Sequence, residues 1–182
     1  MTLQEHLYLF YKKYKLPPDG GVELSTFEVP LPFFTILLPN LSWRKKMLYI
    51  HDLEHILNEQ DTTWKGEMYI ASWEISTGFW KSFPLIIFPL WTMGWGIWKH
   101  PTAVFGGFRS GHSKTGIANL DIPKEQILEM SLSQLKAITK AKKTDHSNLY
   151  FYTKLTTWIL VSQLVFWLPL ILFLSLMLSF WK

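Results

Sequence analysis

Residues 155–181 read LTTWILVSQLVFWLPLILFLSLMLSFW, a run of 27 residues without a charged side chain that is bounded by Lys154 and Lys182. Aromatic side chains stand near both ends of the run, as they do at membrane–water interfaces. As a helix, the run would be about 40 Å long, against a hydrocarbon core of about 30 Å. The segment therefore predicts a transmembrane helix that tilts, kinks at Pro169 or places one end among the lipid headgroups.

Basic residues precede this run. Residues 136–154 include five lysines and one aspartate, a net charge of +4 that equals the net charge of the whole chain. Positive charge beside a membrane segment marks the cytoplasmic side and attracts anionic lipids. The pattern predicts a basic linker over residues 141–154 and a domain on the cytoplasmic face of a bacterial inner membrane, or on the matrix side of the mitochondrial inner membrane. Nucleic acid is not an expected partner, because the rest of the chain is near neutral and has no basic patch interleaved with aromatic residues.

The composition narrows the chemistry. The 182 residues include no cysteine, which excludes disulfide scaffolds, cysteine-ligated zinc sites, iron–sulfur clusters and thiol nucleophiles. Any catalytic or metal-binding group must therefore be a histidine, a carboxylate or a hydroxyl. A hydrophobic content of 48% with ten tryptophans is high for a soluble protein. We expect a mostly α-helical protein, with a compact domain over residues 1–140 ahead of the linker and the transmembrane helix.

Four further segments have recognisable local patterns. Residues 1–15 have apolar side chains at helical spacing and predict an amphipathic helix, whereas residues 26–38 predict an extended stretch interrupted by proline. Residues 121–138 predict a single capped helix that turns its leucines inward. The glycines of residues 105–111 are more typical of a connecting loop than of a helix.

A helix expected over residues 43–58, with Ser42 as its N-cap, carries the residues with the clearest chemical meaning. His51, Asp52 and His55 form the pattern His-Asp-x-x-His. Two histidines four residues apart on a helix direct both imidazoles to one point, which is the arrangement that two ligands of a divalent metal need. Asp52 lies close enough on the helix surface to join the same centre. The alternative is that the pair faces water while the apolar side of the helix enters the core.

A second helix is expected over residues 64–80, after a turn and N-cap at residues 61–63. Glu67 and Glu74 lie on one face of this helix, seven residues apart. A helical hairpin would bring Glu67 back toward the first helix. Because an unpaired carboxylate is costly to bury among aromatic residues, both acids need partners. The alternative is a stripe of small residues for close helix packing, with both acids at a wet edge.

The composite pattern resembles the signature of a known family. His51-Asp52-x-x-His55 is followed after eleven residues by Glu67, and this looks like the metal-binding motif of the ubiquinone biosynthesis protein Coq4 family. The resemblance extends loosely over residues 7–138. The transmembrane tail is a departure, since members of that family are usually peripheral membrane proteins.

The resemblance implies a mostly helical fold and a zinc-like divalent ion held at His51, Asp52, His55 and Glu67. It also implies action on a prenylated precursor of coenzyme Q, namely oxidative removal of the ring C1 carboxylate with hydroxylation there, within a membrane assembly of quinone-pathway proteins. Two imidazoles and two carboxylates would be electrically neutral with one divalent ion, and an open coordination position could bind a substrate oxygen. We add Glu74 as a hydrogen-bond acceptor or proton carrier, so that Glu67 and Glu74 are the candidate catalytic residues. Because zinc has no redox chemistry, an oxidative step needs an iron-type metal, dioxygen or a partner's cofactor.

A prenyl lipid needs an apolar path to such a site. Residues 82–98 carry no charge but contain proline and glycine, so they resemble a kinked helix or re-entrant wall more than a second span. Together with residues 32–38 they could line a channel from the bilayer to the metal, or they could simply be core or membrane-dipping surface. Arg109, Trp64 and Trp73 are candidate substrate contacts, with Arg109 as an anion-binding side chain.

Two other functions stay open. His51-x-x-Glu54-His55 also fits an inverted zincin pattern with Glu54 as the base, which would make the protein a membrane metallopeptidase. That class takes its third metal ligand from much further downstream in the sequence. A peptidase would also leave Asp52 and Glu67 without a role. The chain could also be a non-catalytic subunit that binds lipid and scaffolds a membrane complex. His100 and His112 could complete a further ligand set.

Overall fold

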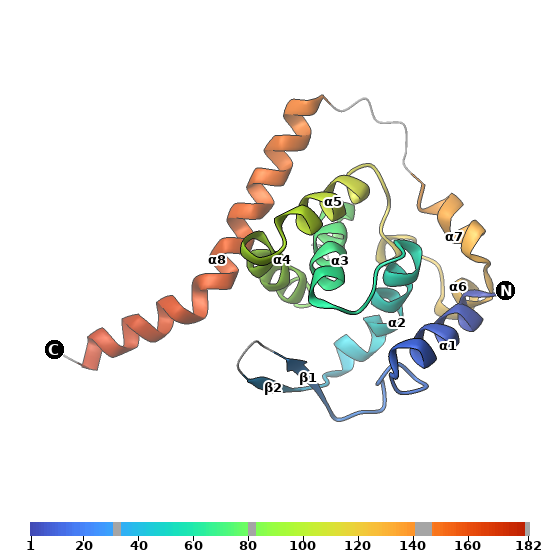
Figure 1. The fold of residues 1–182 in the computed structure, drawn as a ribbon, viewed down its shortest axis with the longest axis horizontal. Helices are drawn as coiled ribbons and strands as arrows, with labels where there is room; N and C mark the ends of the chain where they lie inside the picture. Colours follow the sequence, from blue (N-terminus) through green and yellow to red (C-terminus); the bar gives the residue numbers. More distant parts are fainter. Residues whose placement is uncertain (31–33, 80–82, 141–146, 181–182) are drawn as a thin grey trace. The chain divides into compact units, whose positions relative to one another are not determined.

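The computed structural model describes residues 1–30, 34–79, 83–140 and 147–180, which form eight α-helices, a short 3-10 helix and a two-stranded sheet (Figure 1). In chain order the elements are α1 (Leu3–Tyr14), β1 (Thr26–Pro30), β2 (Thr35–Pro39), α2 (Ser42–Leu57), α3 (Trp64–Thr77), α4 (Ile87–Lys99), α5 (Pro101–Gly111), η2 (Ile117–Asn119), α6 (Lys124–Glu129), α7 (Leu132–Ile138) and α8 (Asn148–Phe180). The prediction of a mostly helical chain with a long apolar C-terminal helix is confirmed. Parts of other predictions lie outside the described residues, namely residues 31–33, Trp80, Ser82, residues 141–146 of the basic linker, and Trp181.

The chain divides into two compact units. Unit 1 comprises residues 1–59 and 120–138, and unit 2 comprises residues 60–119 and 139–182. Unit 1 therefore contains α1, the β1–β2 hairpin, α2, α6 and α7, whereas unit 2 contains α3, α4, α5 and α8. The histidines of the sequence motif belong to unit 1, and its final glutamate belongs to unit 2.

Helix α1 begins with a capping box. Thr2 Oγ1 accepts a hydrogen bond from the N–H of Glu5 at 3.2 Å, and Glu5 Oε2 accepts one from the N–H of Thr2 at 2.8 Å. The helix ends before Lys15, which adopts the left-handed conformation with φ 55°. The buried side chains of α1 are Leu3, Leu7, Phe10 and Tyr11. This one-sided burial confirms the amphipathic helix predicted from the spacing.

The β1–β2 hairpin follows α1. Its two strands pair antiparallel, with Thr26 opposite Pro39 and Pro30 opposite Thr35. The extended stretch predicted from the sequence is therefore confirmed over residues 26–30 and 35–38. Both strands are mostly exposed or half-buried, so the hairpin contributes little to the core.

The start of α2 is held by a side chain other than the expected one. The prediction of Ser42 as N-cap is wrong, because Leu41 occupies the cap position and makes no side-chain hydrogen bond. Asn40 fixes the entry to the helix instead. Its Nδ2 donates to the carbonyl oxygens of Gly21 and Leu24 at 2.9 and 3.0 Å. A buried amide thus ties the preceding loop to the first turn of the histidine-bearing helix.

The prediction of one helix over residues 121–138 is wrong. Met130 is extended, with φ −66° and ψ 156°, and it separates α6 from α7. Ser131 and Gln134 then exchange hydrogen bonds, because the backbone N–H of each donates to the side chain of the other at 2.7 and 3.3 Å. Such a reciprocal pair starts a new helix. The buried side chains of these two short helices are Ile127 and Leu135.

Close contact between the backbones of α3 and α5 forms the centre of unit 2. A Cβ atom on Gly111 would lie 2.8 Å from the carbonyl oxygen of Trp73, and one on Gly107 would overlap the carbonyl oxygen of Tyr69. The prediction of a connecting loop over residues 105–111 is wrong, since this segment is helical. Gly107 and Gly111 serve close helix packing, for which small residues four apart are suited.

Helix α4 packs against α8 through a second glycine contact (Figure 1). A Cβ atom on Gly94 would lie 2.5 Å from the carbonyl oxygen of Ser162. The side chain of Gln163 joins the two helices, because its Nε2 donates to the carbonyl oxygen of Gly94 at 2.7 Å. Its Oε1 accepts from the indole N–H groups of Trp98 and Trp167 at 2.9 and 3.2 Å. Both the nitrogen and the oxygen of the Gln163 amide are thus hydrogen-bonded in an otherwise apolar surrounding.

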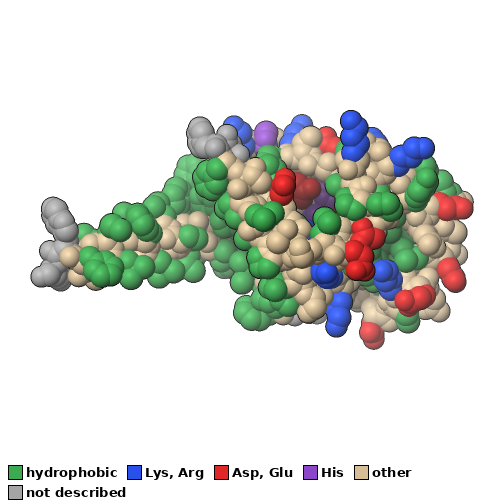
Figure 2. All heavy atoms as spheres, turned by 90° about the horizontal axis from the view of Figure 1, so that it is seen from below, with side chains coloured by type: hydrophobic (Ala, Val, Ile, Leu, Met, Phe, Trp, Pro, Cys, Tyr) green, Lys and Arg blue, Asp and Glu red, His purple; other side chains and the backbone are tan. Residues whose placement is uncertain are grey.

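Helix α8 is the helix that, in the described part of the chain, is long and apolar enough to cross a membrane. From Trp167 to Phe180 every residue is exposed. Figure 2 shows this part of α8 as a projection covered by hydrophobic side chains. The ribbon of α8 bends in its C-terminal half (Figure 1), where Pro169 removes one helical hydrogen bond.

Candidate metal centre

Helix α2 places two imidazole rings in contact. His51 and His55 lie one turn apart, and their Nε2 atoms are 3.3 Å from each other. The ring planes meet at 77°, with the ring centroids 4.9 Å apart. His55 is buried with 1% of its surface exposed, and His51 is half-buried. The pair therefore does not simply face water, which was the alternative that the sequence left open.

The distance between the two nitrogens fits a tetrahedral metal ion. Two ligand atoms that each lie about 2.0–2.1 Å from zinc, at the tetrahedral angle, are about 3.3 Å apart. The same distance allows one imidazole to donate its Nε2–H to the other when no ion is bound. The helix therefore holds both nitrogens at the separation that an ion needs.

The neighbouring residue Asp52 is held by α1. Tyr11 donates its hydroxyl hydrogen to Asp52 Oδ2 at 2.9 Å, and both side chains are buried. Burial and the nearby charge of Asp52 raise the pKa of Tyr11 well above its ordinary value. The phenol thus stays protonated and remains a donor at physiological pH. Gly20, with φ 70°, passes so close that a Cβ atom there would lie 2.7 Å from Tyr11 Oη.

We expect Tyr11→Phe to lower the free energy of unfolding by about 1.5–3 kcal/mol, because a buried carboxylate loses a hydrogen-bond donor. Tyr8→Phe is the matched control, since Tyr8 is on the same helix and 61% exposed, and it should change stability by less than about 0.5 kcal/mol. Denaturant unfolding of the three proteins in the same neutral detergent measures both effects. Equal midpoints for the two variants would show that the bond to Asp52 contributes nothing to stability.

Glu54 is buried to a degree that the sequence did not suggest. Only 1% of its surface is exposed, and it lies three residues after His51 on α2. The sequence assigned this residue only the role of base in the alternative peptidase. Because a buried carboxylate is stabilised by a cation or by hydrogen bonds, Glu54 becomes a further candidate ligand. Glu54 is three residues after His51 and therefore shares a face of α2 with it, which was the sequence signal that could have indicated Glu54 as a ligand.

Helix α3 of unit 2 carries the two acids Glu67 and Glu74. The predicted N-cap is confirmed, because Thr63 Oγ1 accepts a hydrogen bond from the N–H of Gly66 at 3.5 Å. The helix ends at Thr77, before a left-handed glycine with φ 105°. Glu67 stands in the first turn and is half-buried, whereas Glu74 is buried with 4% of its surface exposed. Two turns of helix thus separate the two carboxylates on one face.

The three predicted substrate contacts lie in unit 2 in different surroundings. Trp73 is fully buried. Trp64 packs edge-on against Trp95, with the ring centroids 4.5 Å apart at 68°. Arg109 is exposed on α5 and lines a pocket. Their contact with a substrate stays a prediction.

The described residues contain a candidate metal-binding cluster of histidine and glutamate side chains. Its histidines are His51 and His55, and within the described ranges Asp52, His100 and His112 are not members. The role of Asp52 as a ligand therefore stays a prediction of the sequence motif. Tyr11 is a residue of this region that sequence reasoning missed, because its contact with Asp52 joins positions 41 residues apart.

Comparison with known proteins assigns no family. No protein family, curated protein or solved structure matches the chain. The resemblance to the Coq4 family accordingly rests on the His-Asp-x-x-His and glutamate motif.

Proposed function

We propose that this protein is a membrane-anchored, Coq4-like protein that binds a divalent metal and acts on a prenylated aromatic lipid in quinone biosynthesis. The observation that carries this proposal is the 3.3 Å separation of the Nε2 atoms of His51 and His55. An i, i+4 histidine pair alone is common, but here it stands within a longer pattern that includes Asp52 and Glu67. The complete pattern favours a metal centre over a pair of structural histidines.

In the proposed centre the imidazoles of His51 and His55 and the carboxylates of Asp52 and Glu67 would hold a divalent ion. Two negative charges balance a divalent cation, which lowers the cost of burying the site. When bound, the metal would polarise an oxygen of the substrate as a Lewis acid. Tyr11 orients the Asp52 carboxylate through its hydrogen bond. Glu74 accepts or carries a proton beside the ligands. These donor groups would suit a zinc-like ion, whereas an oxidative reaction would require an iron-type metal or a partner's cofactor.

The membrane part of the proposal rests on α8. Its exposed apolar residues from Trp167 to Phe180 would be unstable in water as a free surface, and lysines precede the helix in the sequence. We propose insertion into the bacterial inner membrane with the metal-binding helices on the cytoplasmic side, or on the matrix side of the mitochondrial inner membrane. A prenyl lipid would then reach the protein from the bilayer, where other quinone-pathway proteins also act. The same anchor would serve a non-catalytic lipid-binding scaffold, which is the second candidate function.

Metal analysis tests the proposal. We expect full-length protein, purified in neutral detergent without chelator, to contain about one divalent ion per chain by elemental analysis. His51→Ala and Glu67→Ala should each lose most of it, because removal of a ligand weakens a metal site by more than the 10–100-fold typical of outer-sphere changes. Mass spectrometry of the co-purified lipid should find a prenylated aromatic compound.

His6→Ala and Glu59→Ala are the controls, since His6 lies on α1 and Glu59 is exposed and paired with Lys136 at 3.1 Å. Both should keep the metal. Wild-type protein that contains no metal but still carries lipid would reject the metal-dependent function and leave the scaffold. Retention of the ion in Glu67→Ala with loss in His51→Ala would remove Glu67 from the ligand set.

A further inference from the structure

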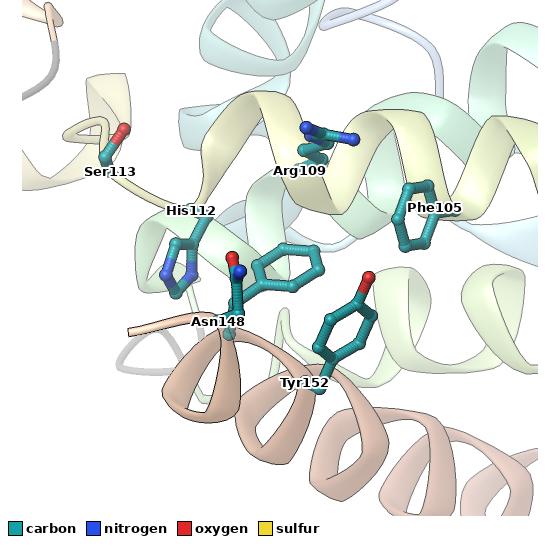
Figure 3. Close-up of a pocket in the computed structure, with 7 residues that line it drawn as sticks. Phe105, Arg109, His112, Ser113, Asn148 and Tyr152 are labelled. Carbon is teal, nitrogen blue, oxygen red and sulfur yellow. The ribbon is translucent and has the colours of Figure 1, made fainter. Parts of the chain in front are cut away.

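A pocket of unit 2 lies between α5 and the first turns of α8 (Figure 3). Its volume is about 200 Å³. The residues that line it are Phe105, Arg109, His112, Ser113, Asn148, Phe151 and Tyr152. In Figure 3, Asn148 and Tyr152 rise from α8 toward α5, and the Tyr152 hydroxyl is directed toward α5 on the side of Phe105. The proposed metal ligands are not among the lining residues.

The lining is suited to an anion. Arg109 is exposed and carries a permanent positive charge, and no carboxylate is among the described lining residues. The side chains of Ser113, Asn148 and Tyr152 can all donate hydrogen bonds. A guanidinium group with neighbouring neutral donors is the arrangement that binds phosphate oxygens, because its planar fork donates two parallel hydrogen bonds.

The N-terminus of α8 adds to the positive electrostatic potential beside the pocket. The helix is 33 residues long and begins at Asn148, so its N-terminus carries the positive end of the helix dipole. The backbone N–H groups of the first turn point toward the N-terminal end of the helix. One of them, the N–H of Tyr150, already donates a hydrogen bond to Ser147 Oγ. Arg109 and the helix terminus therefore attract the same anion.

The position along α8 indicates where the anion would come from. Tyr152 precedes the charge-free run by three residues, or about 5 Å of helix. The headgroup region extends about 5–8 Å beyond each side of the hydrocarbon core. If α8 tilts so that the whole charge-free run lies in the hydrocarbon core, the pocket lies at the level of the lipid phosphates. Phe105 and Phe151, whose rings meet edge-on with centroids 5.8 Å apart, offer an apolar wall beside the polar groups.

We infer that this pocket binds a phosphate group, with Arg109 as the main ligand and Tyr152 as a hydrogen-bond donor. The phosphate belongs to a lipid headgroup or is a free phosphate. The site is independent of the proposed metal centre, and the lipid source alone rests on the proposed membrane anchor. Loss of the metal function in the experiment above would therefore leave this inference standing.

Binding to the full chain in dodecyl maltoside micelles tests the inference, with dioctanoyl phosphatidic acid, dioctanoyl glycerol and inorganic phosphate as probes in microscale thermophoresis. We expect Arg109→Gln to weaken binding of the phosphatidic acid by about 10-fold or more, because charge-assisted hydrogen bonds are lost. Tyr152→Phe should weaken it by about 3–10-fold. Lys65→Gln, which removes an exposed charge from α3, is the matched control and should stay within about 2-fold.

The three probes separate the sources. Binding of phosphatidic acid without binding of inorganic phosphate or the phosphate-free diacylglycerol supports a lipid headgroup site. Equal and competing affinity for inorganic phosphate supports a free-phosphate site. If Arg109→Gln and Tyr152→Phe bind like wild type, or if Lys65→Gln loses as much affinity as Arg109→Gln, then general electrostatic attraction explains binding and the pocket is rejected. Should Arg109→Gln fail to fold, the conservative Tyr152→Phe variant decides.

Discussion

Gly107→Ala is expected to destabilise the protein by at least about 2 kcal/mol. The added methyl group would overlap the carbonyl oxygen of Tyr69 on α3. A backbone atom of a helix cannot move aside as a flexible side chain can, so α3 and α5 would have to separate. Separation would also disturb the hydrogen bond from Ser76 Oγ to the carbonyl oxygen of Phe108, which is 2.7 Å long. Thermal unfolding in neutral detergent, followed by circular dichroism, should show a midpoint lowered by roughly 4–8 °C.

Gly106→Ala is the matched control for this variant. Gly106 is the preceding residue of the same helix, and a Cβ atom there would lie 3.4 Å from the Tyr69 ring, an ordinary contact. Replacement of a helical glycine by alanine favours the helix by up to about 1 kcal/mol. Gly106→Ala should therefore leave the midpoint unchanged or raise it. Equal midpoints for the two variants would mean that α3 and α5 are not held in backbone contact.

This glycine contact explains why the sequence prediction of a loop over residues 105–111 failed. Glycine has low helix propensity, and a local pattern with several glycines is typical of a loop. The helix forms because Gly107 and Gly111 lie on one face and allow α3 to approach closely. The helix is stabilised by its packing against α3, so local helix propensity alone could not indicate that this segment is helical. The spacing of small residues at positions 103, 107 and 111 was the available signal.

The helices with a regular apolar pattern could be predicted from the sequence, but their ends could not. The spacing of apolar residues indicated α2 and α3 to within a few residues. The start of α2 was misplaced because Asn40, which fixes the entry to the helix, donates to carbonyl groups 16 and 19 residues away. The break between α6 and α7 was missed because the reciprocal bonds of Ser131 and Gln134 compete with continuation of the helix. Bounds thus depend on individual hydrogen bonds that a periodic pattern does not contain.

In the candidate site, too, only the features that follow from local sequence spacing could be predicted. The contact of His51 with His55 follows from helix geometry, and the sequence therefore predicted it. The burial of Glu54 and the bond from Tyr11 to Asp52 depend on which elements pack against α2. No spacing rule connects Tyr11 and Asp52 along the chain. Groups of site residues that are close in the sequence could be predicted, whereas the contacts that support them could be identified only in the three-dimensional structure.

The length of the exposed part of α8 determines how the helix meets a bilayer. From Trp167 to Phe180 there are 14 exposed residues, which span about 21 Å. A complete crossing requires about 20 residues, so several residues before Trp167 must also enter the membrane. Those residues include Gln163, whose amide is hydrogen-bonded to Gly94, Trp98 and Trp167. An amide whose nitrogen and oxygen both form hydrogen bonds is less costly to bury in lipid, and α4, which exposes apolar side chains, would then lie at membrane level beside α8.

The double variant Leu172→Arg and Leu176→Arg is therefore expected to release the protein from membranes. Each arginine at the centre of a span costs about 2.5–3.5 kcal/mol, and both leucines are more than half exposed in the protein. Leu149→Arg with Thr153→Arg is the matched control. It adds the same charges at the same spacing to exposed residues of α8 that precede the charge-free run.

Alkaline carbonate extraction of cell membranes measures the outcome. Wild type and the control should stay in the membrane pellet, whereas the Leu172 and Leu176 variant should move to the supernatant or aggregate. If all three proteins are extracted alike, α8 does not enter the bilayer. Its exposed apolar surface would then have to be covered in another way, and a lipid substrate could not be delivered from the membrane along this helix. The same result would remove the lipid source for the phosphate pocket while leaving Arg109 available to a free phosphate.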